Sequence, residues 1–150
     1  MADTCTQIYL HIVISVGSGK SFLKKTWRAD LFHYISGVIR NRKHKVIAIN
    51  GSDDHIHIFI RYVPLERLGD LVNAVKSTAM IWLRQKRYVR PDFHWQPGYT
   101  AFSHSRSQVG GLIRYIDRQE LHHRRKSFRD EHSELLKNSG YSVHHIYDYH

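Results

Sequence analysis

Two short groups of residues in this chain have the types and the spacing for metal chemistry. His55 and His57 are separated by one residue inside an apolar run, and Tyr115 precedes Gln119 by four positions. Side chains two apart in a strand point to one face of a sheet, and side chains four apart share one face of a helix. If the two faces meet, two imidazoles and one carboxamide form a metal site beside a phenol. Such a site could cleave a phosphodiester with tyrosine as the nucleophile.

The charge of the chain indicates the class of its partner. Lys and Arg number 23 against 13 Asp and Glu, a formal net charge of +10 with neutral histidine. This excess predicts a polyanionic partner, nucleic acid first and an anionic membrane surface second, with a merely soluble basic protein as the plain alternative. Candidate DNA-binding residues lie on two expected helices, although each could be an ordinary solvated charge: Arg40, Arg42, Lys76, Arg84 and Arg87.

Length and cysteine content indicate a cytoplasmic protein of one compact domain, spanning 1–150. The single cysteine, Cys5, cannot form an intramolecular disulfide or a cysteine-based zinc site, which fits a reducing compartment. The N-terminal residues lack the basic-then-apolar order of a signal peptide. No apolar run approaches the length of a membrane span, so no membrane insertion is expected.

The elements that must position the histidines and the tyrosine can be read from hydrophobic periodicity. Alternating and branched apolar residues predict strands over 9–16, 46–49, 55–62 and 99–102. Helical spacing predicts helices over 31–39, with Asp30 as its N-cap, and over 68–83. Ser105 and Gln108 fit a capping box, which begins a third helix that includes Tyr115 and Gln119. A short helix is expected around Phe128 to Leu136.

This order of elements predicts an α+β fold of the ferredoxin-like (RRM-like) type, βαββαβ, with an additional C-terminal helix that carries the tyrosine. The first and third strands are then adjacent and central in an antiparallel sheet, with two helices on one face. The histidine pair would lie at the middle of the open face.

Four further features of the sequence bear on its function. Gly17–Ser21 suggests a phosphate-binding loop, but Ile14 stands where that motif needs a glycine, which favours a flexible basic loop. Thirteen histidines make a His-x-His pair a weak motif, and only the strand around it favours a function. A basic stretch, His122–Lys126, follows Tyr115 and Gln119. Arg114, Arg118, Arg124 and Arg125 surround Tyr115, so we expect them to help lower the pKa of the phenol. Gly110 and Gly111 are a hinge or a loose first turn.

Three segments in order make the chain resemble a known family: His55-Ile56-His57, Trp95–Ser103 and Tyr115–Gln119. The chain resembles the single-tyrosine HUH transposases of the IS200/IS605 insertion sequences, from the first strand to about Phe128. The resemblance implies that His55, His57 and Gln119 bind a divalent metal and that Tyr115 is the catalytic nucleophile. Mixed nitrogen and oxygen ligation suits Mn²⁺, and Mg²⁺ is more abundant in cells.

The resemblance also implies an activity and partners. Members of this family cleave single-stranded DNA at hairpin-containing element ends, form a 5′-phosphotyrosine and rejoin strands. They are homodimers in which the tyrosine helix can complete the partner's histidine pair. The expected enzyme is therefore a metal-dependent tyrosine transposase, both a single-strand DNA endonuclease and a strand transferase. No general base is apparent in the sequence.

Three alternatives stay open. A domesticated relative acting on chromosomal palindromic repeats would share the chemistry. A non-catalytic RRM-like nucleic-acid-binding module would use the same sheet topology and stack bases on aromatic side chains. A replication-initiator nuclease would share the chemistry in a chain that is commonly longer.

Overall fold

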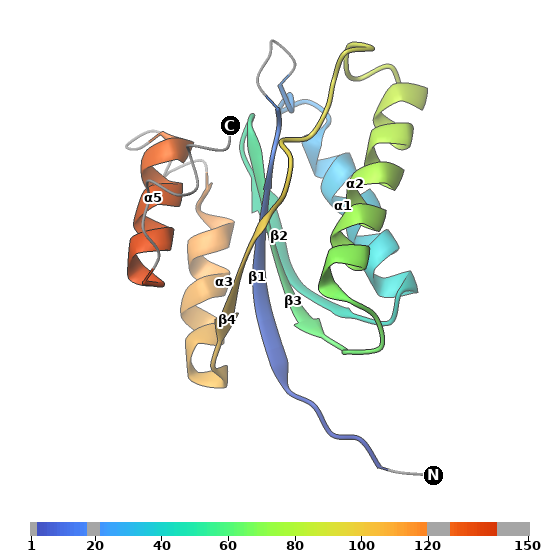
Figure 1. Cartoon of the computed structure of the whole chain (residues 1–150). Coiled ribbons are helices and arrows are strands. Elements are labelled where there is room, and N and C mark those ends of the chain that lie inside the picture. The colour runs from blue at the N-terminus through green and yellow to red at the C-terminus, as the bar shows by residue number, and fades with distance from the viewer. Residues whose placement is uncertain (1–2, 18–21, 120–126, 141–150) are drawn as a thin grey trace.

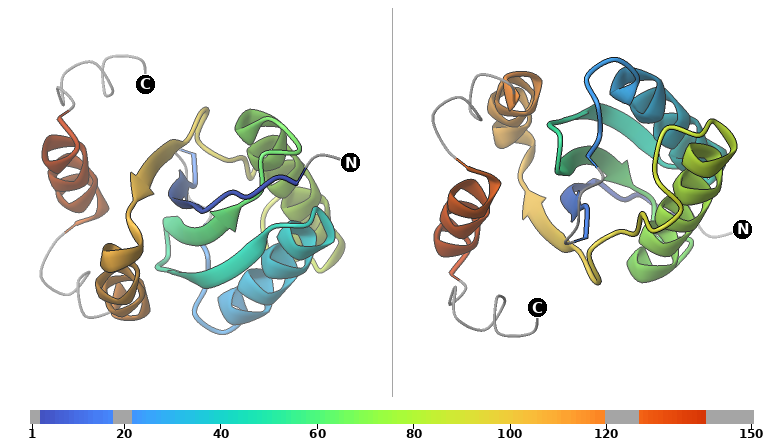
Figure 2. Two further views of the ribbon diagram at one scale, coloured as in Figure 1. Left: turned by 90° about the horizontal axis from the view of Figure 1, so that it is seen from below. Right: turned by 90° about the horizontal axis from the view of Figure 1, so that it is seen from above.

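The computed structural model describes residues 3–17, 22–119 and 127–140. Four strands form one antiparallel sheet with helices on both faces (Figures 1 and 2). In chain order, the first six elements are β1 (Ile8–Ser15), α1 (Arg28–Asn41), β2 (Lys45–Gly51), β3 (His55–Tyr62), α2 (Leu68–Gln85) and β4 (Thr100–His104). This order and the strand arrangement β2-β3-β1-β4 confirm the predicted ferredoxin-like plan, with β1 and β3 at the centre.

Helices α1 and α2 cover one face of the sheet and form the larger core with it (Figure 1). Alternate residues of the central strands, Ile12, Ile56 and Ile58, face these helices and are almost fully buried. The apolar stripes of the two helices supply the opposing side: Leu31, Ile35, Ile39, Leu71, Val75 and Leu83. Burial of a side chain of this size stabilises the fold by about 1.5–3 kcal/mol.

Helix α1 begins one turn earlier than its periodicity predicts. Its N-cap is Trp27, so the prediction that Asp30 caps the helix is wrong. The cause is the apolar stripe, because Trp27 and Leu31 are four residues apart and both are buried in the same core. Asp30 instead lies in the first turn, where its carboxylate interacts favourably with the helix dipole.

The opposite face of the sheet is covered by α3 (Val109–Asp117) and α5 (Phe128–Asn138). The predicted capping box is present, but it begins a short 3₁₀ turn, η1 (Arg106–Gln108), that leads into α3. Phe59, Leu112 and Ile116 form a second, smaller core beneath α3. The sheet therefore separates two cores of unequal size. Among the described helices, none has the length and apolar character to cross a membrane.

Helix α3 ends two residues before Gln119, so the predicted helix does not extend over both Tyr115 and Gln119. Asn50 on β2 explains this end, because its Nδ2 donates to the carbonyl oxygens of Ile116 at 3.0 Å and Asp117 at 3.2 Å. Carbonyls in the last turn of a helix need such partners. The hydrogen bonds attach the C-terminal end of α3 to the strand next to the histidine pair.

Candidate active site

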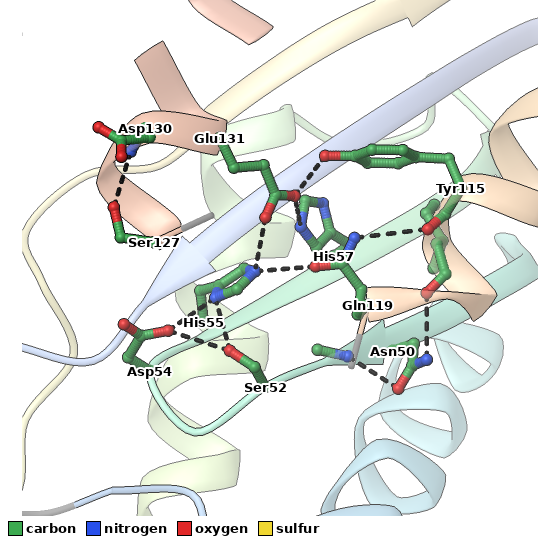
Figure 3. Close-up of polar contacts among 12 residues, drawn as sticks. Asn50, Ser52, Asp54, His55, His57, Tyr115, Gln119, Ser127, Asp130 and Glu131 are labelled. Carbon is green, nitrogen blue, oxygen red and sulfur yellow. Dashed lines mark hydrogen bonds and ion pairs between the residues drawn. The ribbon is translucent and has the colours of Figure 1, made fainter. Parts of the chain in front are cut away.

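His55 and His57 lie on β3, on the sheet face opposite α1 and α2, as predicted. This face was expected to be open, but α3 and α5 cover it, and the two imidazoles point toward these helices (Figures 1 and 3). Both imidazoles are fully buried. Ile56 and Ile58 alternate with them and belong to the core on the other face. The alternation of one central strand therefore supplies the main core and a pair of imidazoles at the same time.

Glu131 on α5 completes a group that sequence reasoning missed. Its Oε1 lies 2.9 Å from Nε2 of His57, and its Oε2 lies 3.8 Å from Nε2 of His55. The ligand atoms of these three buried residues lie within 4.8 Å of one another. A signal was available, because Glu131 stands at i+3 from Phe128, on the apolar side of an expected helix. A carboxylate in that position needs a buried partner.

Gln119, the predicted third ligand, also reaches the histidine pair. It is fully buried, and its Oε1 lies 3.0 Å from Nε2 of His55. Its amide group donates back to the carbonyl oxygen of Tyr115 at 3.5 Å. Gln119 therefore meets His55 from just beyond the helix end rather than from the helix face that the sequence suggested.

Tyr115 points into the same group of side chains (Figure 3). Its hydroxyl donates a hydrogen bond to Oε1 of Glu131, and its ring meets that of His57 edge-on at a centroid distance of 5.8 Å. Burial raises the pKa of Tyr115, and the hydrogen bond and charge of Glu131 raise it further. The expected lowering of this pKa is wrong, because Arg114 and Arg118 are exposed while the phenol is enclosed beside a carboxylate.

Glu131 is anionic in this arrangement. Burial alone would raise the pKa of its carboxyl group, but the hydrogen bond and the charge of His57 outweigh burial and hold the pKa well below its usual range. The hydrogen bond from Tyr115 adds to this effect. The buried carboxylate therefore faces two imidazoles and a phenol.

Contacts of the Nδ1 atoms orient both imidazoles. Nδ1 of His55 lies 2.8 Å from Oδ1 of Asp54 and 3.0 Å from Oγ of Ser52. Nδ1 of His57 lies 2.7 Å from Nε2 of His11, which is fully buried on β1. Burial, followed by the nearby charge of His57, lowers the pKa of His11 well below its usual value. His11 was also missed, although a histidine among the apolar residues of a central strand was a signal.

The nitrogen and oxygen atoms of this group suit the ligation of a divalent cation. A carboxylate only accepts hydrogen bonds, so the contact with Asp54 places a hydrogen on Nδ1 of His55. In the neutral imidazole, the Nε2 lone pair then faces the carboxamide oxygen of Gln119. Two acceptors that face each other, beside a second imidazole and a carboxylate, suit a shared cation.

The predicted DNA-binding residues lie on or just after α1 and α2, on the other side of the sheet from this site. Arg42 pairs with Glu66, with 3.0 Å between Nε and Oε1. Nζ of Lys76 donates to the carbonyl oxygen of Gln96 at 2.9 Å and to that of Gly98, and burial lowers the pKa of Lys76. Nη2 of Arg84 contacts the carbonyl oxygen of Phe93 at 3.5 Å. Contacts of Arg40, Arg42, Lys76, Arg84 and Arg87 with DNA stay predictions.

Two of the sequence signals lie largely outside the described residues. They are Ser18–Ser21 of the glycine-rich segment and the basic stretch His122–Lys126. Trp27 and Trp95 are both 6% exposed and belong to the larger core.

Comparisons with known proteins give one family and one fold. The family model described as "Transposase IS200 like" matches residues 4–119. None of the curated proteins compared with the chain is similar enough to match it.

Two solved structures share the fold. A protein of Deinococcus radiodurans R1 assigned as a transposase is 17% identical, with a TM-score of 0.57 over 79% of this chain and 95% of that chain. A REP-associated tyrosine transposase bound to a REP hairpin is 16% identical, with a TM-score of 0.61 over 82% of this chain and 74% of that chain.

Proposed function

This chain belongs to the IS200-like transposase family, and from that membership we propose that it cleaves and rejoins single-stranded DNA through a phosphotyrosine on Tyr115. The observation that carries the proposal is the convergence of the Tyr115 hydroxyl with His55, His57 and Gln119 around the carboxylate of Glu131. The proposed nucleophile and the proposed metal ligands thus belong to one group of side chains.

We propose that the cofactor is Mg²⁺ or Mn²⁺. Nε2 of His55, Nε2 of His57 and Oε1 of Gln119 would hold it, and the carboxylate of Glu131 adds an anionic oxygen to the set. A bound ion supplies positive charge that stabilises the charge gathering on the phosphate oxygens during bond exchange.

The residues of the chain account for the remaining steps. The phenolic oxygen of Tyr115 forms a bond to phosphorus as the bond from phosphorus to the 3′ oxygen breaks. The phenolic proton leaves along its hydrogen bond to Oε1 of Glu131 and is released to solvent, because the lowered pKa of Glu131 does not let the carboxyl group keep it. The 3′ oxygen takes up a proton from solvent and leaves as a hydroxyl. The phosphodiester is exchanged for a phosphotyrosine ester, so rejoining by a 3′ hydroxyl needs no ATP.

We propose hairpin-containing single-stranded DNA as the substrate. The net charge of +10 favours a polyanion, and the REP-associated relative in the comparison was solved with a REP hairpin. A homodimer is also proposed on the basis of family membership. Light scattering of the purified chain tests it, and a monomer with and without hairpin DNA would contradict it.

The test of the nucleophile is Tyr115→Phe, with Tyr9→Phe as the matched control. Tyr9 packs against Phe59 on the same face of the sheet. Each variant therefore removes one tyrosine hydroxyl from that face. Hairpin oligonucleotides from the DNA flanking the gene are incubated with Mn²⁺ or Mg²⁺ and separated on a denaturing gel. We expect a covalent adduct with the wild type and Tyr9→Phe and none with Tyr115→Phe, which retains hairpin binding. An adduct in Tyr115→Phe would refute the assignment.

A domesticated role on chromosomal palindromes is the second candidate. It is favoured by the likeness to the REP-associated transposase, and palindromic repeats scattered through the genome rather than flanking the gene would support it. The RRM-like alternative is less favoured, because His55, His57 and Phe59 are fully buried on the sheet face where such modules stack bases.

A further inference from the structure

A pocket of about 570 Å³ lies next to the candidate active site, between β4 and the helices α3 and α5. Its size is within the usual range for small-ligand sites. Both apolar and polar side chains line it, chiefly Phe102, Leu112, Leu135, His11, His104 and Asn138. None of the residues assigned above as ligand or nucleophile lines it, so the pocket is separate from the candidate metal site.

His11 presents a buried polar atom in this wall. Its side chain is fully buried, and its Nε2 lies 2.7 Å from Nδ1 of His57. Its other ring nitrogen, Nδ1, has no hydrogen-bond partner among the residues that the structure describes. A buried polar atom without a partner costs about 1–3 kcal/mol, and a ligand that supplied the partner would recover that free energy.

The contact with His57 determines what His11 offers. When His57 binds a metal through Nε2, its hydrogen is on Nδ1 and is donated to Nε2 of His11. A neutral His11 then carries its own hydrogen on Nδ1. Nδ1 of His11 is then a buried hydrogen-bond donor on a residue that lines the pocket.

His104 supplies the complementary group. Its Nδ1 lies 3.3 Å from Oε1 of Gln108, which also accepts a hydrogen bond from the backbone N–H of Ser105 at 3.0 Å. Nδ1 of His104 is therefore the donor, and its Nε2 is an acceptor. This Nε2 is also buried without a partner among the described residues. The rings of His11 and His104 have centroids 6.0 Å apart.

We propose that this pocket binds one unpaired nucleobase of the DNA strand. Every DNA base carries an acceptor and a donor side by side on its pairing edge, which matches the donor of His11 and the acceptor of His104. The apolar side chains of Phe102, Leu112 and Leu135 suit the faces of the ring. The inference rests on the proposed function only for the source of the base, which would belong to the single strand that is cleaved. The pocket and the proposed metal site are neighbours, because His11 lines the pocket and its ring contacts that of His57.

The contribution of the bases to DNA affinity can be separated from that of the phosphates with oligonucleotides of 12 nucleotides. Fluorescence anisotropy in the presence of Mg²⁺ compares dT, dA and dC homopolymers with an abasic strand that has the same phosphates. Stacking and pairing in a pocket contribute about 1–3 kcal/mol per base. We therefore expect the full-length wild type to bind at least one base-bearing strand about 10-fold more tightly than the abasic strand.

Leu135→Trp fills the pocket, and Lys137→Trp is its matched control at an exposed position of the same helix. We expect Leu135→Trp to bring the affinity for base-bearing strands to within about 2-fold of the abasic strand, as expected from the lost stacking free energy. Affinity for the abasic strand should not change. Lys137→Trp should retain the full preference. Equal preferences in the two variants, or no preference in the wild type, would overturn the proposal.

A second variant keeps the proposal testable if Leu135→Trp does not fold. His104→Leu removes the acceptor of the pocket and should also abolish the preference for bases, whereas an unchanged preference would count against the pocket. These results are independent of catalysis. Base preference without DNA cleavage would refute the proposed function but support the base-binding pocket. Cleavage without base preference would support the proposed function but refute the pocket.

Discussion

Replacement of Glu131 by glutamine removes the charge at the centre of the candidate site with almost no change of shape. The residue is 4% exposed, and its Oε1 lies 2.9 Å from Nε2 of His57. A hydrogen bond between charged partners contributes about 1.5–3 kcal/mol, and removal of one partner of a buried ion pair costs about 3–5 kcal/mol. Because the amide oxygen of glutamine can still accept from Tyr115, we expect Glu131→Gln to lower the free energy of unfolding by about 2–3 kcal/mol at pH 7.

The pH dependence gives this prediction a sign. His57 lowers the pKa of Glu131 below its value in the unfolded chain, so folding favours the ionised form. The contribution is complete above the unfolded pKa, about 4.3, and is lost as the pH falls through the lowered folded pKa. The difference between wild type and Glu131→Gln should therefore shrink as the pH falls below about 4.

Urea unfolding of both proteins in EDTA, at several pH values, measures this difference. Glu134→Gln is the control, because it makes the same change at an exposed position of α5 and should alter stability by less than about 0.5 kcal/mol. A difference for Glu131→Gln that is as small as the control's at pH 7, or one that does not shrink below about pH 4, would refute the ion pair with His57.

Three further changes test other parts of the structure. His57→Ala should abolish metal-dependent cleavage on a denaturing gel, and unchanged cleavage would exclude His57 as a ligand. Lys76→Met should lower the free energy of unfolding by about 1–2 kcal/mol, because its ammonium group donates to carbonyl oxygens of the loop at Gln96. The same variant tests the predicted contact of Lys76 with DNA: a loss of affinity for single-stranded DNA would support the contact, and unchanged affinity would contradict it. Phe59→Ala should cost about 3–5 kcal/mol in urea unfolding, because the ring is fully buried at the centre of the smaller core, and a loss under about 1 kcal/mol would contradict that placement.

The fold and half of the candidate site follow from local patterns. Strand alternation placed His55 and His57 on one face, and the order of elements placed their strand at the sheet centre. Both statements depend only on periodicity and on the few topologies open to that order of elements. Gln119 was predicted by resemblance, and its side chain does reach His55.

The remainder depends on contacts between distant segments. Glu131 meets His57 across 74 positions of the sequence, and no spacing rule connects them. The same contact reversed the expected direction of the Tyr115 pKa, because a buried carboxylate, rather than exposed arginines, is the charge nearest the phenol. The start of α1 was misplaced for a related reason, since Trp27 caps it through burial in the core and not through a polar side chain.

The unequal cores on the two faces of the sheet have a consequence for local unfolding. Separation of α3 from the sheet exposes the cluster of Phe59, Leu112 and Ile116, while the extensive cluster under α1 and α2 stays intact. Openings that expose less apolar surface require less free energy. Amide hydrogens of α3 should therefore exchange with solvent faster than those of β1 and β3. The helix that carries the tyrosine can leave and return while the strand that holds the histidines remains folded.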